Sequence, residues 1–66
     1  MDNIKIAEQA RKTAQGIVET ILATRTRGDN KTEAILIRTF HTLSNVHLKA
    51  VGRALRVNDN WEIEEV

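Results

Sequence analysis

Several residue types that stabilise or interrupt small domains are missing from this chain of 66 residues. It has no cysteine and no proline, and its only aromatic residues are Phe40 and Trp61. The lack of cysteine excludes disulfides and thiolate chemistry. The two histidines, His41 and His47, are too few for a structural zinc site. Two aromatic rings also argue against a stacking platform for single-stranded nucleic acid, which needs several.

Long apolar runs are missing too. No stretch approaches the roughly 18 apolar residues of a membrane span. Residues 1–12 contain acids and lack the apolar segment of a signal peptide. We therefore expect no membrane contact and a cytoplasmic protein.

The chain does contain enough apolar residues, 41%, to exclude global disorder. A core from 66 residues is nevertheless marginal without a disulfide, a metal or a partner subunit. We therefore expect a single domain, residues 1–66, that self-associates.

Charge divides the chain into a basic body and an acidic tail. All ten lysines and arginines lie between Lys5 and Arg56, and five acids precede Arg56. The tail that follows contains Asp59, Glu62, Glu64 and Glu65 and no base. Such a body suits anionic partners, although the tail opposes binding to a nucleic-acid polymer.

The pattern predicts an all-α fold, a two-helix antiparallel hairpin with a short acidic tail. We expect a first helix over about 3–27, a turn at 28–30, a second helix over about 31–57 and a tail at 58–66. Residues 61–66 of the tail fit a short extended segment, either docked on a neighbouring hairpin or disordered. Gly28 suits the left-handed position after a helix, and Asn30 with Glu33 resembles a capping box.

The second predicted helix has two adjacent apolar seams. Two seams indicate two partners, the first helix of the same chain and another chain, and hence a homo-oligomeric helical bundle. One seam comprises Leu36, Phe40, Leu43, His47, Ala50, Ala54 and Val57, and the other comprises Ala34, Ile37, His41, Ser44, Leu48, Val51 and Leu55.

No group of residues has the pattern of a catalytic site. Ser44, the only serine, lies between His41 and His47 on an apolar seam, where a packed small residue is the simpler interpretation. Each histidine is interpreted as a hydrogen-bonded residue at the edge of the core. We expect no enzyme activity, no metal and no cofactor.

Basic residues cluster at the predicted turn. Arg25, Arg27 and Lys31 lie beside the start of the second helix, whose first N–H groups can bind phosphate. The alternative is a solvated basic turn, and the side chains of Asp29 and Asn30 would compete for the same N–H groups.

Two further arginines lie outside this cluster. Arg11 begins a second basic pair with Lys12. Arg38 lies among apolar residues, where it either extends to solvent or projects into an oligomer pore.

The segment Asp29-Asn30-Lys31-Thr32-Glu33-Ala34-Ile35, followed by Ile37-Arg38-Thr39 and Ser44-Asn45, resembles the second helix of a family of phage hairpin proteins. These are the anti-CBASS and anti-Thoeris sponges, which sequester signalling nucleotides of bacterial immunity. The resemblance covers about residues 6–48. The family's longer N-terminal segment, which supplies an aromatic residue and a lysine, has no counterpart.

The resemblance implies an immune-evasion protein, in the host cytoplasm if phage-encoded, that sequesters cyclic oligonucleotides without cleaving them. It implies a homo-oligomer, with a hexamer favoured over a dimer or tetramer. Family-like contacts would fall on Lys31 and Arg38 and on Thr39 or Thr42. Trp61 would replace the missing aromatic by stacking on a base.

Two other functions stay open. A small inhibitor or adaptor would bind a host protein through an apolar seam or the acidic tail. A nucleic-acid-binding bundle would use its basic face, and its affinity would fall steeply with salt.

Overall fold

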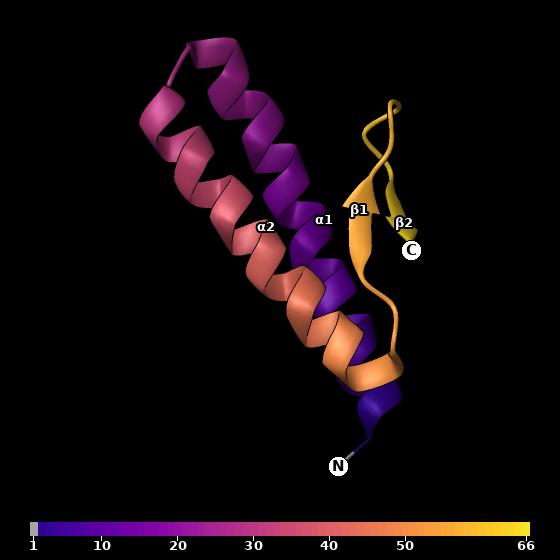
Figure 1. The fold of residues 1–66 in the computed structure, drawn as a ribbon. Helices are drawn as coiled ribbons and strands as arrows, with labels where there is room; N and C mark the ends of the chain where they lie inside the picture. The colour runs from indigo at the N-terminus through magenta and orange to yellow at the C-terminus, as the bar shows by residue number, and fades with distance from the viewer. Residues whose placement is uncertain (1) are drawn as a thin grey trace.

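The structure, a computed structural model, describes residues 2–66 as two helices followed by two short strands. Helix α1 (Asn3–Arg27) and helix α2 (Asn30–Val51) lie side by side and run in opposite directions (Figure 1). Strands β1 (Leu55–Val57) and β2 (Ile63–Glu65) form a hairpin against one side of the helical pair.

The bounds of α1 agree with the sequence prediction. The side chain of Asp2 caps the helix by accepting a hydrogen bond of 3.0 Å from the Ile4 N–H. Gly28 ends it with φ 73°, in the left-handed region where glycine has no steric penalty. The turn chemistry predicted for residue 28 is therefore confirmed.

The start of α2 differs slightly from the prediction. Asp29, rather than Asn30, is the capping residue, and its carboxylate accepts a hydrogen bond of 3.1 Å from the Thr32 N–H. Asn30 is the first residue of the helix. An aspartate at this position satisfies one of the otherwise unpaired N–H groups of the first turn.

The predicted end of the second helix at about residue 57 is wrong, whereas the extended segment expected within the tail contains strand β2 at Ile63–Glu65. Helix α2 ends at Val51, because Gly52 adopts φ 77° and its N–H bonds to the Leu48 carbonyl at 2.7 Å. Residues 55–57 instead pair antiparallel with residues 63–65, with Leu55 opposite Glu65. The fold is thus mostly helical but not all-α.

The core lies where this β-hairpin packs on the helices. All four elements contribute to it: Ala14 and Val18 from α1, Phe40 from α2, Leu55 from β1 and Ile63 from β2.

The β-hairpin also covers part of a predicted interface. Ser44 and Leu55 belong to one of the two predicted apolar seams, which were expected to face the first helix and another chain. Ser44 bonds to Leu55 of the chain's own β-hairpin, so this part of the seam faces neither of the two expected partners.

Within residues 2–66, neither helix is long and apolar enough to cross a membrane.

Candidate functional site

The β-hairpin holds the only tryptophan of the chain in its turn. Asn58 organises this turn, because its side-chain oxygen accepts hydrogen bonds from the N–H groups of Asn60 and Glu62 at 2.9 and 3.0 Å. Trp61 adopts φ 61°, a left-handed conformation that is sterically costly for a bulky residue. The surrounding turn therefore fixes the position of the indole.

Trp61 meets an arginine from α1 across a cleft. The Arg25 guanidinium carbon lies 4.8 Å from the ring centroid of Trp61, within cation–π range. The cleft has a volume of about 250 Å³, and we call it the Trp61 cleft. Its lining combines apolar side chains with groups that can bind anions or stack on rings. Its residues are Ile21, Arg25, Ile37, Phe40, His41, Leu55, Arg56, Val57 and Trp61.

Both arginines of the Trp61 cleft are held by carboxylates. The Arg25 Nε donates to Glu33 Oε1 at 2.6 Å, and the Arg56 Nε donates to Glu64 Oε1 at 3.1 Å. These pairs orient the guanidinium groups and offset part of their charge. In each ion pair the donor is the Nε atom. The terminal amino groups of the two guanidiniums take no part in these pairs. The cleft therefore has aligned donors with modest net charge.

The turn between the helices is less suited to an anion than its basic residues suggest. Hydrogen bonding from Thr32, first from its side chain and then from its backbone N–H, lowers the pKa of Asp29 from its ordinary value of 3.8. The ionised carboxylate then occupies the Thr32 N–H, one of the groups that a phosphate would use. Arg27 and Lys31 lie exposed beside it.

The other predicted contact residues lie on α2. Arg38 is exposed. The hydroxyl groups of Thr39 and Thr42 donate to carbonyls of their own helix, those of Ile35 and Arg38, at 3.0 and 3.2 Å. Of the eight residues predicted to bind a ligand, the structure brings Arg25 and Trp61 together and places none of the other six in their cleft.

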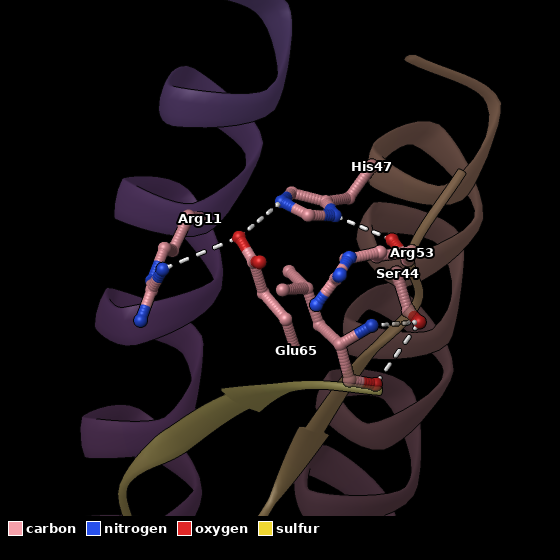
Figure 2. A network of polar contacts seen from close by, with 6 residues as sticks. Arg11, Ser44, His47, Arg53 and Glu65 are labelled. Atoms are coloured by element: carbon pink, nitrogen blue, oxygen red, sulfur yellow. Dashed lines mark hydrogen bonds and ion pairs between the residues drawn. The ribbon is translucent and has the colours of Figure 1, made fainter. Parts of the chain in front are cut away.

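The remaining predicted residue, Arg11, belongs to a separate polar network (Figure 2). Its guanidinium lies 3.4 Å from Glu65 Oε1 on β2, and the same oxygen lies 3.3 Å from the Nε2 of His47. The Nδ1 of His47 bonds to the Arg53 carbonyl. Because both neighbours are acceptors, the doubly protonated ring satisfies both contacts, whereas the neutral ring can donate to only one.

This network fastens the β-hairpin to the helices. His47 is hydrogen-bonded as predicted, but at 1% exposed it is more deeply buried than the edge-of-core position expected for it. Beside it, the Ser44 hydroxyl accepts from the Leu55 N–H at 2.9 Å and donates to the Leu55 carbonyl at 3.0 Å (Figure 2). The serine thus pairs both backbone groups of a strand residue, which is a structural role.

Sequence reasoning overlooked two residues of the Trp61 cleft, His41 and Arg56. Arg56 was assigned to the end of a helix, so its place on a strand beside Trp61 had no signal in the helical pattern. His41 was recognised as a residue at the edge of an apolar seam, and its exposed ring packs edge-on against Phe40, with centroids 6.4 Å apart.

Among residues 2–66, no group of three or more histidine, aspartate or glutamate side chains is arranged to hold a metal ion. Comparison with family models, with curated proteins and with solved structures finds no match to this chain.

Proposed function

We propose that this protein binds a cyclic oligonucleotide and sequesters it without cleaving it, as a homo-oligomer that evades bacterial immune signalling. The observation that supports this proposal is the cleft in which Trp61 faces Arg25, with Arg56 and His41 in the same lining. An indole stacks on any nucleobase, and stacking of this kind contributes about 1–3 kcal/mol per base. Guanidinium groups bind phosphate oxygens in bidentate geometry.

The partial exposure of Trp61 leaves ring surface for a ligand. The residue is 36% exposed although Arg25 lies over its ring. A base that stacks on the open part of the ring would place its phosphate near the arginines at the cleft wall. The Ile37 and Phe40 side chains supply the apolar floor typical of small-molecule sites.

The size of the Trp61 cleft limits what one subunit can hold. At about 250 Å³ it is smaller than the ~300–1,000 Å³ of pockets that enclose a drug-sized ligand. It suits one base and its phosphate. A cyclic oligonucleotide with two or three bases would therefore need clefts from more than one copy, which favours a homo-oligomer with the ligand between subunits.

Calorimetry against a panel of cyclic dinucleotides, cyclic trinucleotides and cyclic ADP-ribose isomers tests the proposal. We expect heat with at least one of them, and recovery of that nucleotide intact by chromatography. Trp61→Ala should weaken binding at least tenfold, which corresponds to about 1.4 kcal/mol, near the lower end of the range for a stacked base.

Arg27→Gln is the matched control for Arg25→Gln, because both arginines lie in the last turn of α1 and only Arg25 lines the Trp61 cleft. Arg25→Gln should weaken binding, and Arg27→Gln should leave it unchanged. No heat with any member of the panel would reject the proposal, and cleaved nucleotide would replace it with an enzyme.

A further inference from the structure

Each arginine of the Trp61 cleft is paired with a carboxylate that does not itself line the cleft. Glu33, in the first turn of α2, contacts Arg25 at 2.6 Å. Glu64, on β2, contacts Arg56 at 3.1 Å. The cleft therefore presents two guanidinium groups whose positive charges are matched one for one by negative charges.

The charge on the Arg56 side of the cleft is more negative still. Arg56 and Glu64 also line a neighbouring surface pocket of about 280 Å³, together with Asp59. Asp59 thus adds a second carboxylate beside Arg56. With His41 counted as neutral, as in the formal charge of the chain at pH 7, two positive groups face three negative ones. The cleft has guanidinium donors without a net positive charge.

The phosphate groups of nucleotides fall into two charge classes. A phosphodiester carries one negative charge, whereas a terminal phosphate monoester carries about 1.5 to 2 at pH 7. An arginine whose charge is unopposed attracts the monoester more strongly. Where a carboxylate already neutralises the arginine, the additional negative charge gains little attraction, and the stronger hydration of the monoester must still be lost on binding.

A phosphate in the Trp61 cleft would share a guanidinium group with the carboxylate behind it. The carboxylates of Glu33 and Glu64 bind the Nε atoms, and bidentate contact with a phosphate would use the two terminal amino groups of the same guanidinium. Only one planar group then separates the two anions. At so short a separation, each extra negative charge on the phosphate is repelled by the carboxylate as well as attracted by the arginine.

We infer that the Trp61 cleft selects phosphodiesters against terminal phosphate monoesters, and that Glu33 and Glu64 determine this selectivity. The inference rests on the proposed function and narrows its ligand class to nucleotides whose phosphates are all internal, as in a closed ring. Hydrolysis of one phosphodiester in such a ring adds water across a P–O bond and leaves a hydroxyl and a terminal monoester. The cleft therefore retains the intact ring and binds its linear hydrolysis product more weakly.

Glu33 should contribute more to this selectivity than Glu64. The side chain of Glu33 is 20% exposed, whereas that of Glu64 is 42% exposed. Water and salt screen the more exposed charge more fully, so Glu33 repels a second negative charge more strongly. Its partner Arg25 is also the arginine that lies over the Trp61 ring, so this ion pair lies beside the surface on which a base would stack.

Calorimetry with three adenine dinucleotides at low ionic strength tests the selectivity, because an indole stacks on any base and screening is then weakest. The probes are cyclic diadenylate, linear ApA and 5′-phosphorylated ApA. Cyclic diadenylate should bind most tightly, and the 5′-phosphate should leave the affinity of ApA unchanged or lower it. A 5′-phosphate that raises the affinity of ApA about threefold or more would overturn the inference, since that is the behaviour of a basic site.

Glu33→Gln removes the carboxylate charge but keeps an oxygen that accepts a hydrogen bond from Arg25. It should raise the affinity ratio of 5′-phosphorylated ApA to ApA about threefold, the size expected of one partly exposed charge pair, and Glu64→Gln should raise it less.

Glu19→Gln is the matched control, because it makes the same charge change at an exposed position of α1 outside the Trp61 cleft, and it should leave the ratio unchanged. Circular dichroism checks that each variant stays helical. Equal ratios in Glu33→Gln and Glu19→Gln overturn the inference. Binding of the three probes without discrimination rejects the inference alone, whereas no binding of any probe counts against the proposed function and rejects the inference with it.

Discussion

The Ser44 hydroxyl holds the β-hairpin on the helices, and Ser44→Ala measures how much. Ser44 is 7% exposed and Leu55 is 4% exposed, so the backbone N–H and carbonyl of Leu55 that it pairs are shielded from water. The substitution removes two hydrogen bonds and leaves both backbone groups unpaired. Each unpaired buried group costs about 1–3 kcal/mol. We expect a loss of about 2–4 kcal/mol in the free energy of docking.

That loss is large for a chain of this length. At about 0.05–0.15 kcal/mol per residue, the free energy of unfolding of such a domain is roughly 3–10 kcal/mol. The β-hairpin should therefore undock in Ser44→Ala before the helices unfold. Trp61 is the only tryptophan and lies in the β-hairpin turn, so its fluorescence reports docking, while far-ultraviolet circular dichroism reports the helices.

In a denaturant titration, we expect the fluorescence transition of Ser44→Ala to precede the circular dichroism transition. Thr26→Ala is the control, because its hydroxyl is exposed and donates to the Leu22 carbonyl of its own helix at 3.0 Å. It should be neutral or slightly stabilising, since alanine has the higher helix propensity. Coincident transitions in Ser44→Ala, shifted no further than those of Thr26→Ala, would show that Ser44 does not hold the β-hairpin.

Three further substitutions test other contacts of the fold by denaturant unfolding. Glu65→Ala removes the carboxylate that faces buried His47 and should cost about 1–3 kcal/mol. Glu64→Ala, at an exposed ion pair, should cost under ~1 kcal/mol, and equal losses would contradict this reasoning. Gly52→Ala should cost about 1–2 kcal/mol, because a side chain is strained in the left-handed conformation. Gly52 has φ 77° although the space around it is open, and no loss would show that α2 tolerates another ending. The pKa of Asp29 is lower in the folded chain than its ordinary 3.8, so its stabilisation is complete above that pH and is lost as the pH falls through the folded pKa. Asp29→Asn should abolish this part of the acid dependence, and an unchanged pH profile would contradict the assignment.

The sequence was sufficient to predict α1 and the turn, because local chemistry determines both. An aspartate cap, a seam of small and apolar residues, and a glycine at the left-handed position all lie within or beside the segment that they control. The end of α2 was missed because Ala54, Leu55 and Val57 continue the helical spacing beyond Gly52. Positions 55 and 57 also fit the two-residue period of a strand, and periodicity over so few residues does not separate the two.

The site was only partly predictable for a related reason. Arg25 was expected at a basic turn and Trp61 in a tail, but their contact depends on where the β-hairpin docks. That docking depends on contacts between residues distant in the sequence, such as Ser44 with Leu55 and His47 with Glu65, which have no local sequence pattern. Arg56 was overlooked because the second helix was predicted to extend to about residue 57. Once residues 55–57 are a strand, its side chain lines the Trp61 cleft instead of the end of a helix.

Docking of the β-hairpin on the helices and ligand binding in the Trp61 cleft should therefore stabilise each other. Arg56 and Trp61 reach the Trp61 cleft only when the hairpin is docked, so a ligand there binds the docked state and stabilises it. At a ligand concentration about 100 times its Kd, this stabilisation is about 2.7 kcal/mol. That is similar to the loss expected for Ser44→Ala. In the presence of a cleft ligand at about 100 times its Kd, the fluorescence and circular dichroism transitions of Ser44→Ala should therefore coincide again.

The double variant Ser44→Ala with Trp61→Phe shows whether such a rescue acts through the Trp61 cleft. Proteolysis of residues 53–66 replaces fluorescence as the readout of docking, because the double variant has no tryptophan. The smaller ring of phenylalanine stacks less strongly on a base, so affinity falls and the same ligand concentration should no longer restore docking. Rescue that persists in the double variant would place the ligand outside the Trp61 cleft.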